Sequence, residues 1–342
     1  YLFRTKYGIS MSTNILLMCG GDGSEHEISL LSAKFIEKQL NLTKDFNVIK
    51  VVIHNHQFML DEKNSGYFDA DGDFVFGDKK VKVDCVVPCI HGIPGETGDI
   101  QSFLNIHNIP FIGCDAEASR YCFNKITTKL YFDALGIPNT PYAIIPLKTE
   151  KYKTVALEFF DKYNDIYVKA ASQGSSVGCY HVTKRDDVWD SIVEAFQYST
   201  EVIIEKNIIH RELEVAAYEI DGELKITNPG EIIIPDNLFY TFEEKYSKNS
   251  GTITTVTPEN LTSEEIAKIR DLARRAFVGL KLRDLSRIDF FLSKEDGILI
   301  NEINTFPGAT PISMFPKMLA HNGDNMADFL AKAVKKAISE VK

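Results

Sequence analysis

Two apolar stretches in the last third of the chain carry acidic side chains. Residues 287–292 and 298–304 are separated by a polar turn that contains glycine, which predicts a hairpin of two antiparallel strands. Because side chains alternate along a strand, this pairing can bring Asp289, Glu302 and Asn304 onto one face. The resulting ligand set contains only oxygen donors, which suits Mg²⁺ with its waters and the phosphates of a substrate.

For a single acid, a solvent-exposed position on an amphipathic hairpin is the commoner explanation. Here the neighbours of Asp289 and Glu302 are isoleucine and phenylalanine, so both strands are too apolar for an exposed edge. Buried carboxylates need a partner or a metal. The sequence therefore favours a site for a metal and a nucleotide.

The composition limits the class of protein. The chain has 342 residues, enough for two or three domains, and a formal net charge of -10, which argues against a nucleic-acid partner. We find no stretch of the roughly 18–20 apolar residues that a membrane span requires. Six cysteines lie in or beside apolar runs without paired spacing, as expected for core residues in a reducing cytoplasm. Residues 1–10 precede Met11, and we expect them to be an extension outside the fold.

The amino-terminal part predicts strand, glycine turn and helix over residues 14–40. Such a turn favours an anion, although its spacing matches neither a dinucleotide-binding fingerprint nor a Walker loop, which disfavours a dehydrogenase. Glu25 is explained by helix capping or by binding a substrate ammonium, and both remain open. His91 follows a predicted strand at a turn rich in glycine and proline, a place where open parallel sheets bind ligands.

Two lysines, Lys125 and Lys129, lie in a predicted helix over residues 116–135, where solvent exposure is the usual state of a lysine. Lys169 ends a predicted strand and precedes the small-residue loop 172–178. This loop is either a flexible hairpin or a cover for a triphosphate, and Lys169 favours the second. Residues 235–250 are polar, aromatic and aperiodic, which is typical of a functional or disordered loop.

Several motifs occur in a specific order: GGDGSEHEIS, HGIPGETGD, FNKITTKL, VKAASQGSSVG, IIEKNIIHRELEV, FYTFEEKY and RIDFF with LINEINTFPG. Over residues 11–340 the chain thereby resembles the D-alanine:D-alanine ligase family of the ATP-grasp superfamily. The resemblance implies an α/β fold, α+β in parts, with three domains. These are a parallel-sheet amino-terminal substrate domain (11–113), a central ATP-grasp domain (114–204) and a carboxyl-terminal catalytic domain (205–342), with the nucleotide between the last two.

The resemblance also implies an activity. ATP phosphorylates the carboxylate of a first D-alanine, and the amine of a second attacks this acyl phosphate to give the dipeptide used in peptidoglycan synthesis. ATP and two Mg²⁺ ions, with Mn²⁺ as a substitute, are the implied cofactors. A cytoplasmic homodimer with small-molecule substrates, and with no nucleic-acid or membrane partner, is the implied form.

Residue roles follow from the same resemblance. Glu25 holds the first ammonium in a hydrogen-bonded set with Ser175 and Tyr246, and Arg287 with the Gly308 N–H stabilises the oxyanion. The nucleotide is bound by Lys125, Lys169, Ser176 and Lys245 at the phosphates, by Glu205, Lys206 and Ile208 at the adenine and by Glu212 at the ribose. His91 stands near the first substrate, Ser313 and Met314 bind the second carboxylate, and Asp289, Glu302 and Asn304 bind the metal.

The match to the family pattern varies along the chain. Residues 310–314 read Thr-Pro-Ile-Ser-Met where Thr-Ser-His-Ser-Leu is more usual, while the pair Lys245–Tyr246 is intact, unlike in the D-lactate ligases of vancomycin resistance. A ligase that takes D-serine as second substrate is therefore one alternative. A nucleotide-binding module without turnover is another, disfavoured because a binder has no need of the oxyanion donor Arg287.

Overall fold

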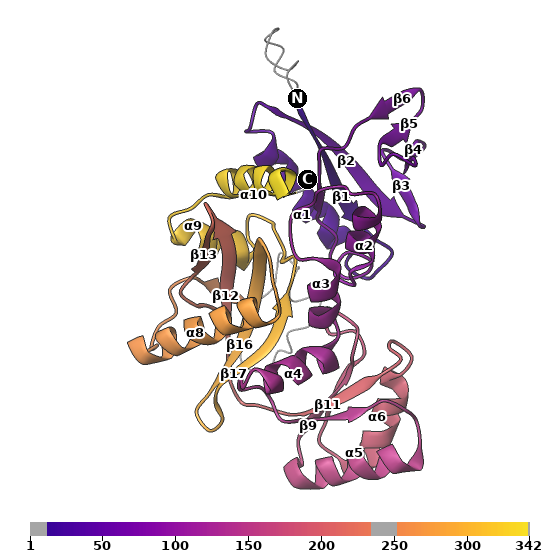
Figure 1. The fold of residues 1–342 in the computed structure, drawn as a ribbon. Coiled ribbons are helices and arrows are strands. Elements are labelled where there is room, and N and C mark those ends of the chain that lie inside the picture. Colours follow the sequence, from indigo (N-terminus) through magenta and orange to yellow (C-terminus); the bar gives the residue numbers. More distant parts are fainter. Residues whose placement is uncertain (1–11, 234–251, 341–342) are drawn as a thin grey trace.

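The computed structural model describes residues 12–233 and 252–340, whose strands form three sheets (Figure 1). The first sheet has the order β6-β5-β4-β3-β2-β1-β7 and is parallel at β2-β1-β7. Its strands are β1 (Thr13–Gly20), β2 (Phe46–His54), β3 (Gln57–Met59), β4 (Ser65–Phe68), β5 (Phe74–Phe76), β6 (Lys79–Val81) and β7 (Cys85–Pro88), with helices α1 (His26–Leu40) and α2 (Asp99–Ile106). Strand β1 is apolar because both faces of the sheet are covered.

The second sheet is antiparallel, with the order β10-β9-β11-β8. Its strands are β8 (Tyr142–Ile145), β9 (Ile166–Ala170), β10 (Cys179–Val182) and β11 (Val202–Lys206). Helices α5 (Glu150–Tyr163) and α6 (Val188–Ala195), the latter preceded by the 3₁₀ turn η1 (Arg185–Asp187), cover one face and enclose a separate apolar core. In Figure 1 this layer lies at the end of the molecule farthest from β1 and β2.

The third sheet has the order β15-β14-β12-β16-β17, with β13 paired to β12. Its strands are β12 (Arg211–Ile220), β13 (Glu223–Ile226), β14 (Gly230–Ile233), β15 (Ile253–Thr255), β16 (Leu285–Ser293) and β17 (Gly297–Asn304). Helix α8 (Ser263–Gly279) begins at a capping box formed by Thr262 and Glu265. Helices α9 (Met314–His321) and α10 (Met326–Glu340) connect this sheet to the first, because their apolar faces share one core with β1 and α1.

The predicted single helix over residues 116–135 is wrong. The chain forms α3 (Ala116–Phe123) and α4 (Lys125–Ala134), separated by Asn124 in an extended conformation. The side chain of Asn124 accepts a hydrogen bond from the Thr127 N–H and caps α4. This break places Lys125 in the first turn of a new helix, at the cavity described below.

The cores do not follow the chain order strictly. Helices α3 and α4 belong to the predicted central domain but pack in one apolar core with α8 and the third sheet. Strand β11 crosses the second predicted domain boundary, because it contains both residue 204 and residue 205. The division at 113/114 and 204/205 remains a prediction. None of the helices in the described ranges combines the length and apolar character needed to cross a membrane.

Candidate active site

Residues from the amino-terminal, central and carboxyl-terminal parts of the chain line one cavity of about 1850 Å³. Almost all of the described candidate residues line it. The amino-terminal part contributes Glu25 and His91, and the central part contributes Lys125, Lys169, Ser175, Ser176, Glu205 and Lys206. The carboxyl-terminal part contributes Ile208, Glu212, Arg287, Glu302, Asn304, Gly308, Ser313 and Met314. Asp289 lies buried directly behind this surface, and Lys245 and Tyr246 lie outside the described residues.

The predicted hairpin is β16 and β17, in which Asp289 faces Glu302 across the strands. A bulge follows, because the next paired residues are Phe290 and Ile300, so that Asn301 is extra on β17. The bulge reverses the alternation of faces: Ile300 stays in the apolar core while Glu302 lines the cavity. Strict alternation would have placed both on one face, so the bulge is what lets an apolar strand present these polar groups.

Arg287 is held between two acids, and we call Glu214, Arg287 and Asp289 the acidic cluster. The guanidinium Nε and Nη2 each lie 2.7 Å from an oxygen of Asp289, and Nε lies 3.2 Å from Glu214 Oε1. Burial opposes the charge, but the two carboxylates outweigh it and raise the pKa of Arg287 well above its usual value. Glu214 also lines the cavity and was missed from the sequence, because on β12 it is one acid among several.

The metal hypothesis concerns the same strands. Asn304 Nδ2 donates to Asp289 Oδ2 at 3.1 Å, so two of the three expected ligands are in contact. Among the described residues no group of three His, Cys, Asp or Glu side chains is arranged to hold a metal, since the third member here is an asparagine and Arg287 covers Asp289. The donor types nevertheless fit a hard divalent cation, since Glu302 and Asn304 line the cavity and Asp289 lies directly behind them, which gives two carboxylates and an amide oxygen.

A second buried group, Lys129, Lys169 and Glu205, is called the basic cluster here. Lys169 Nζ lies 2.6 Å from Glu205 Oε2, and Lys129 Nζ lies 3.1 Å from Oε1. Burial alone would raise the pKa of Glu205, but the two ammonium groups lower it to about 2. The expectation of a solvated lysine is wrong for Lys129, whose side chain is 2% exposed.

Lys125 lies close to the small-residue loop. Its ammonium donates to the Gln173 carbonyl at 2.5 Å, and burial lowers its pKa. In the same loop Ser175 Oγ donates to Glu25 Oε1 at 2.7 Å, across 150 residues of sequence. A Cβ atom at Gly174 would lie 2.7 Å from Glu25 Oε2, so a side chain at this position would displace the Glu25 carboxylate. The loop therefore covers Glu25.

His91 connects the first sheet to the segment that contains Gly308. Its Nδ1 lies 3.1 Å from the Phe306 carbonyl and must donate, since a carbonyl only accepts. Its Nε2 therefore accepts from Ser32 Oγ at 2.8 Å, and Ser32 Oγ in turn accepts from the Ala309 N–H. Burial lowers the pKa of His91, consistent with this neutral tautomer.

Glu96 and Lys317 also line the cavity and were not predicted. Glu96 accepts from the Gly92 N–H at 2.8 Å, and burial together with the charge of Glu25 raises its pKa to about 8. Lys317 donates to Thr254 Oγ1 at 2.9 Å, one helical turn after Ser313. Glu96 lies inside the motif HGIPGETGD, and Lys317 lies three residues after the segment 310–314. Their positions in the sequence could therefore have identified both as candidate site residues.

The predicted nucleotide-base residues lie together where β11 leads into β12. Ile208 is buried in the cavity wall, and the rings of His210 and Phe291 lie beside it with centroids 3.7 Å apart. Lys206 pairs with Asp296 at 2.6 Å. The adenine and ribose roles assigned to these residues remain predictions.

Comparison with known proteins agrees with this geometry. Residues 14–114 match the family model "D-ala D-ala ligase N-terminus", and residues 131–335 match "D-ala D-ala ligase C-terminus". A D-alanine--D-alanine ligase of Vibrio atlanticus is 53% identical over 96% of this chain and 99% of its own.

Solved structures extend the comparison. The D-alanyl-alanine synthetase A of Vibrio cholerae superposes with a TM-score of 0.93 at 49% identity, over 96% of this chain and 99% of that one. The VanG D-Ala:D-Ser ligase of Enterococcus faecalis superposes with a TM-score of 0.82 at 26% identity, over 95% and 99%. The chain is a member of the D-alanine–D-alanine ligase family.

Proposed function

We propose that the protein joins two D-alanine molecules, using ATP and a D-alanyl phosphate intermediate, to give D-alanyl-D-alanine for peptidoglycan. The observation that carries this proposal is one cavity that combines a basic cluster, an acidic cluster and Glu25 under a small-residue loop, in a chain of this family. The reaction needs these three features, because it handles a polyphosphate, a divalent cation and an amino acid together.

The proposed roles follow from charge and position. Lys125 and Lys169, with the Ser176 loop, bind the phosphates of ATP, and residues 205–212 bind the nucleoside. Lys245 and Tyr246 are assigned by the family motif, since they lie outside the described residues.

At the amino-acid end, Glu25 accepts hydrogen bonds from the ammonium of the first D-alanine, oriented by Ser175. His91 donates to the Phe306 carbonyl and so holds the backbone that leads to Gly308. Ser313 and Met314 receive the second carboxylate. The hydroxyl of Ser313 is held by Thr310 Oγ1 at 2.7 Å and by the Thr310 N–H, which fixes its position.

Arg287 and the Gly308 N–H are the proposed donors to the oxyanion that forms when the second amine attacks. Arg287 suits this role because its pair with Asp289 fixes the guanidinium plane before the charge develops. The covering loop excludes water, which would hydrolyse an acyl phosphate.

Asp289, Glu302 and Asn304 would hold Mg²⁺, for which we propose two ions with Mn²⁺ as a substitute. Bound there, the metal would neutralise phosphate charge. We also propose a cytoplasmic homodimer without nucleic-acid or membrane partners, which size-exclusion chromatography with light scattering tests for the oligomeric state.

The test is phosphate release from ATP with Mg²⁺, with products identified by mass. We expect release that depends on D-alanine and not on L-alanine, with D-alanyl-D-alanine as the main product. Release only when D-serine accompanies D-alanine would assign the second pocket to D-serine, as in the VanG neighbour. No release with any of these substrates would overturn the proposal in favour of a binding module.

A further inference from the structure

Lys129 is a buried lysine for which the proposed reaction has no role. It lies on α4, one turn after Lys125, and its side chain is 2% exposed. A buried ammonium costs several kcal/mol unless it is paired and hydrogen-bonded. The surrounding contacts therefore matter more than for a surface lysine.

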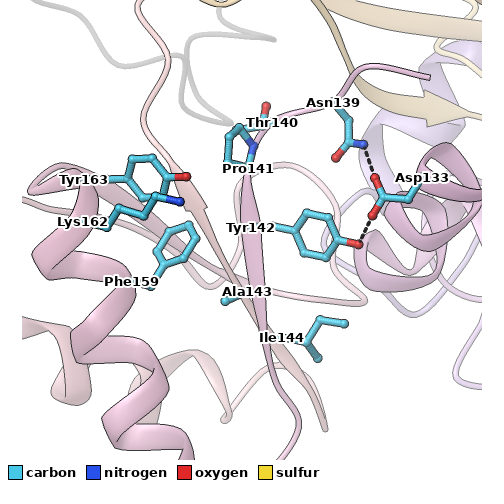
Figure 2. A pocket seen from close by; sticks show the side chains of 10 residues that line it. All are labelled: Asp133, Asn139, Thr140, Pro141, Tyr142, Ala143, Ile144, Phe159, Lys162 and Tyr163. Carbon is cyan, nitrogen blue, oxygen red and sulfur yellow. Dashed lines mark hydrogen bonds between the residues drawn. The ribbon is translucent and has the colours of Figure 1, made fainter. Parts of the chain in front are cut away.

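Its contacts come from one strand of the second sheet and from the segment that leads into the next. On β11, Glu205 Oε1 lies 3.1 Å from Nζ, and Glu205 pairs across the sheet with Tyr142 of β8. Nζ also donates to the Thr140 carbonyl at 3.1 Å and to Asn139 Oδ1 at 3.3 Å, and both of these residues line the open groove drawn in Figure 2. The ring centroid of Tyr142 lies 5.3 Å from the same ammonium.

The groove residues are themselves fixed. Asp133 accepts from Asn139 Nδ2 at 2.8 Å and from the Tyr142 hydroxyl at 2.6 Å, as Figure 2 shows. One carboxylate thus orients two of the groups that surround Lys129. Such a cage holds the ammonium in one place, which a role in filling space alone does not require.

The fixed position of the Lys129 ammonium affects Glu205. Each carboxylate oxygen takes a different lysine, with Lys129 at Oε1 and Lys169 at Oε2. With two ammonium groups and one carboxylate, the cluster keeps one positive charge. Without Lys129, Glu205 and Lys169 would form a neutral one-to-one pair, and the carboxylate would be free to rotate.

We propose that Lys129 is a positioning residue for the nucleotide: by holding Glu205, it fixes the ammonium of Lys169 and leaves its charge available to a phosphate group. This inference rests on the proposed function, because it takes ATP as the ligand of the cavity. Lys129 itself makes no contact with the nucleotide. It acts through the carboxylate that it shares with Lys169.

The test compares Lys129→Met with wild type in two measurements, the Kd of MgADP by calorimetry and the KM values of the ligase reaction. We expect the Kd and the KM for ATP to rise roughly 10- to 100-fold, the size of losing one nearby charge, and the KM for D-alanine to stay within about twofold. Lys162→Met is the matched control, since Lys162 borders the same groove without contacting Glu205 in the described contacts. It should leave both measurements unchanged.

A double-mutant cycle separates this role from a general loss of packing. In a Glu205→Gln background no carboxylate can neutralise Lys169, so adding Lys129→Met should weaken MgADP binding less than about threefold. The comparison in the Glu205→Gln background also tests the role of Lys129 if Lys129→Met alone does not fold. Lys129→Arg, which restores the charge in a larger side chain, should recover part of the affinity.

The outcomes are distinguishable from failure of the proposed function. If wild type binds no MgADP and releases no phosphate, the proposed function is wrong. If wild type binds and Lys129→Met binds equally well, only the role of Lys129 is wrong. A loss of the same size in the Glu205→Gln background would also overturn it, since Lys129 would then not act through Glu205.

Discussion

The basic and acidic clusters border the same cavity. The basic cluster has two cations and one carboxylate, and the acidic cluster has two carboxylates and one cation. In the basic cluster Glu205 lies between Lys129 and Lys169. In the acidic cluster one guanidinium lies between two carboxylates. Each cluster thus has a central ion shared by two counter-ions, one built on β9, β11 and α4 and the other on β12 and β16.

The difference explains how buried charge can serve binding. A lone buried ion is costly, and a one-to-one pair has no charge to offer a ligand. Counted over its own three side chains, each two-to-one cluster gives every charged group an opposite charge nearby and keeps a net charge of one, positive in the basic cluster and negative in the acidic cluster. A nucleotide with its metal ion needs this separation, because its phosphates are anionic and its metal is cationic.

Removing Arg287 should have the largest effect. We expect Arg287→Ala to lower kcat roughly 10²- to 10³-fold, as for a donor to developing charge, while the Kd of ATP changes less than about threefold. Steady-state kinetics and nucleotide titration measure the two quantities. Arg287→Lys should recover little, because it keeps the charge but loses the two-point contact with Asp289.

A different outcome would remove the distinction between the two clusters. If the affinity for ATP fell as steeply as kcat, Arg287 would belong to nucleotide binding, and the acidic cluster would have no separate role. Both variants change the contacts of Glu214 and Asp289, which can destabilise the fold. A thermal melt of each variant therefore tests whether a loss of activity is due to unfolding.

The next largest effect should come from Asp289→Asn, which leaves the acidic cluster with one cation and one carboxylate. Its surplus negative charge is lost, so the Mg²⁺ concentration for half-maximal activity should rise roughly 10- to 100-fold. A Mg²⁺ titration of D-alanine-dependent phosphate release measures this. Asp221→Asn removes an acid from an exposed pair with Lys332 and should leave the titration unchanged. An unchanged titration in Asp289→Asn would exclude Asp289 from metal binding.

Much of the acidic side could be predicted from the sequence. Alternating polar residues in strands that are otherwise apolar mark a buried polar face, and the structure brings Asp289, Glu302 and Asn304 together as expected. The bulge at Asn301 could not be predicted, because it depends on how two strands pair rather than on either strand alone.

The basic side could be predicted less well. In a helical pattern Lys129 looks like any surface lysine, and its partner Glu205 follows 76 residues later, so its burial is a long-range effect. The end of α3 had a local signal, since Asn124 is a favoured N-cap. That signal was obscured because the apolar patterns of the two short helices join into one.

A smaller effect is expected at Ser175, which belongs to neither cluster and tests whether the amino-acid end is independent of both. Loss of the hydroxyl that bonds Glu25 should lower kcat/KM for D-alanine by about tenfold, the value of one hydrogen bond to a charged group, without changing the KM for ATP. Ser175 has a φ of 51°, so both Ser175→Ala and Ser175→Gly should be made. Equal losses in the two variants would assign the effect to the hydroxyl, whereas recovery in the glycine variant would assign it to the backbone.

The smallest effect concerns His91, the neutral residue that connects the first sheet to the segment containing Gly308. Burial lowers its pKa in the folded protein, whereas an unfolded histidine titrates near about 6.5. The unfolded state therefore binds more protons below that pH, and the stability that depends on neutral His91 is fully present above about pH 6.5 and declines as the pH falls.

Between pH 7.5 and 5.5, wild type should therefore lose about 1 kcal/mol more stability than His91→Gln, whose amide can still donate to the Phe306 carbonyl and accept from Ser32. Thermal and urea unfolding at several pH values measure the difference. Parallel pH profiles would mean that His91 takes up its proton as readily in the folded state as in the unfolded state, and burial would then not keep it neutral. A steeper profile for wild type would instead support a neutral His91 that donates to the Phe306 carbonyl and accepts from Ser32 in the folded protein.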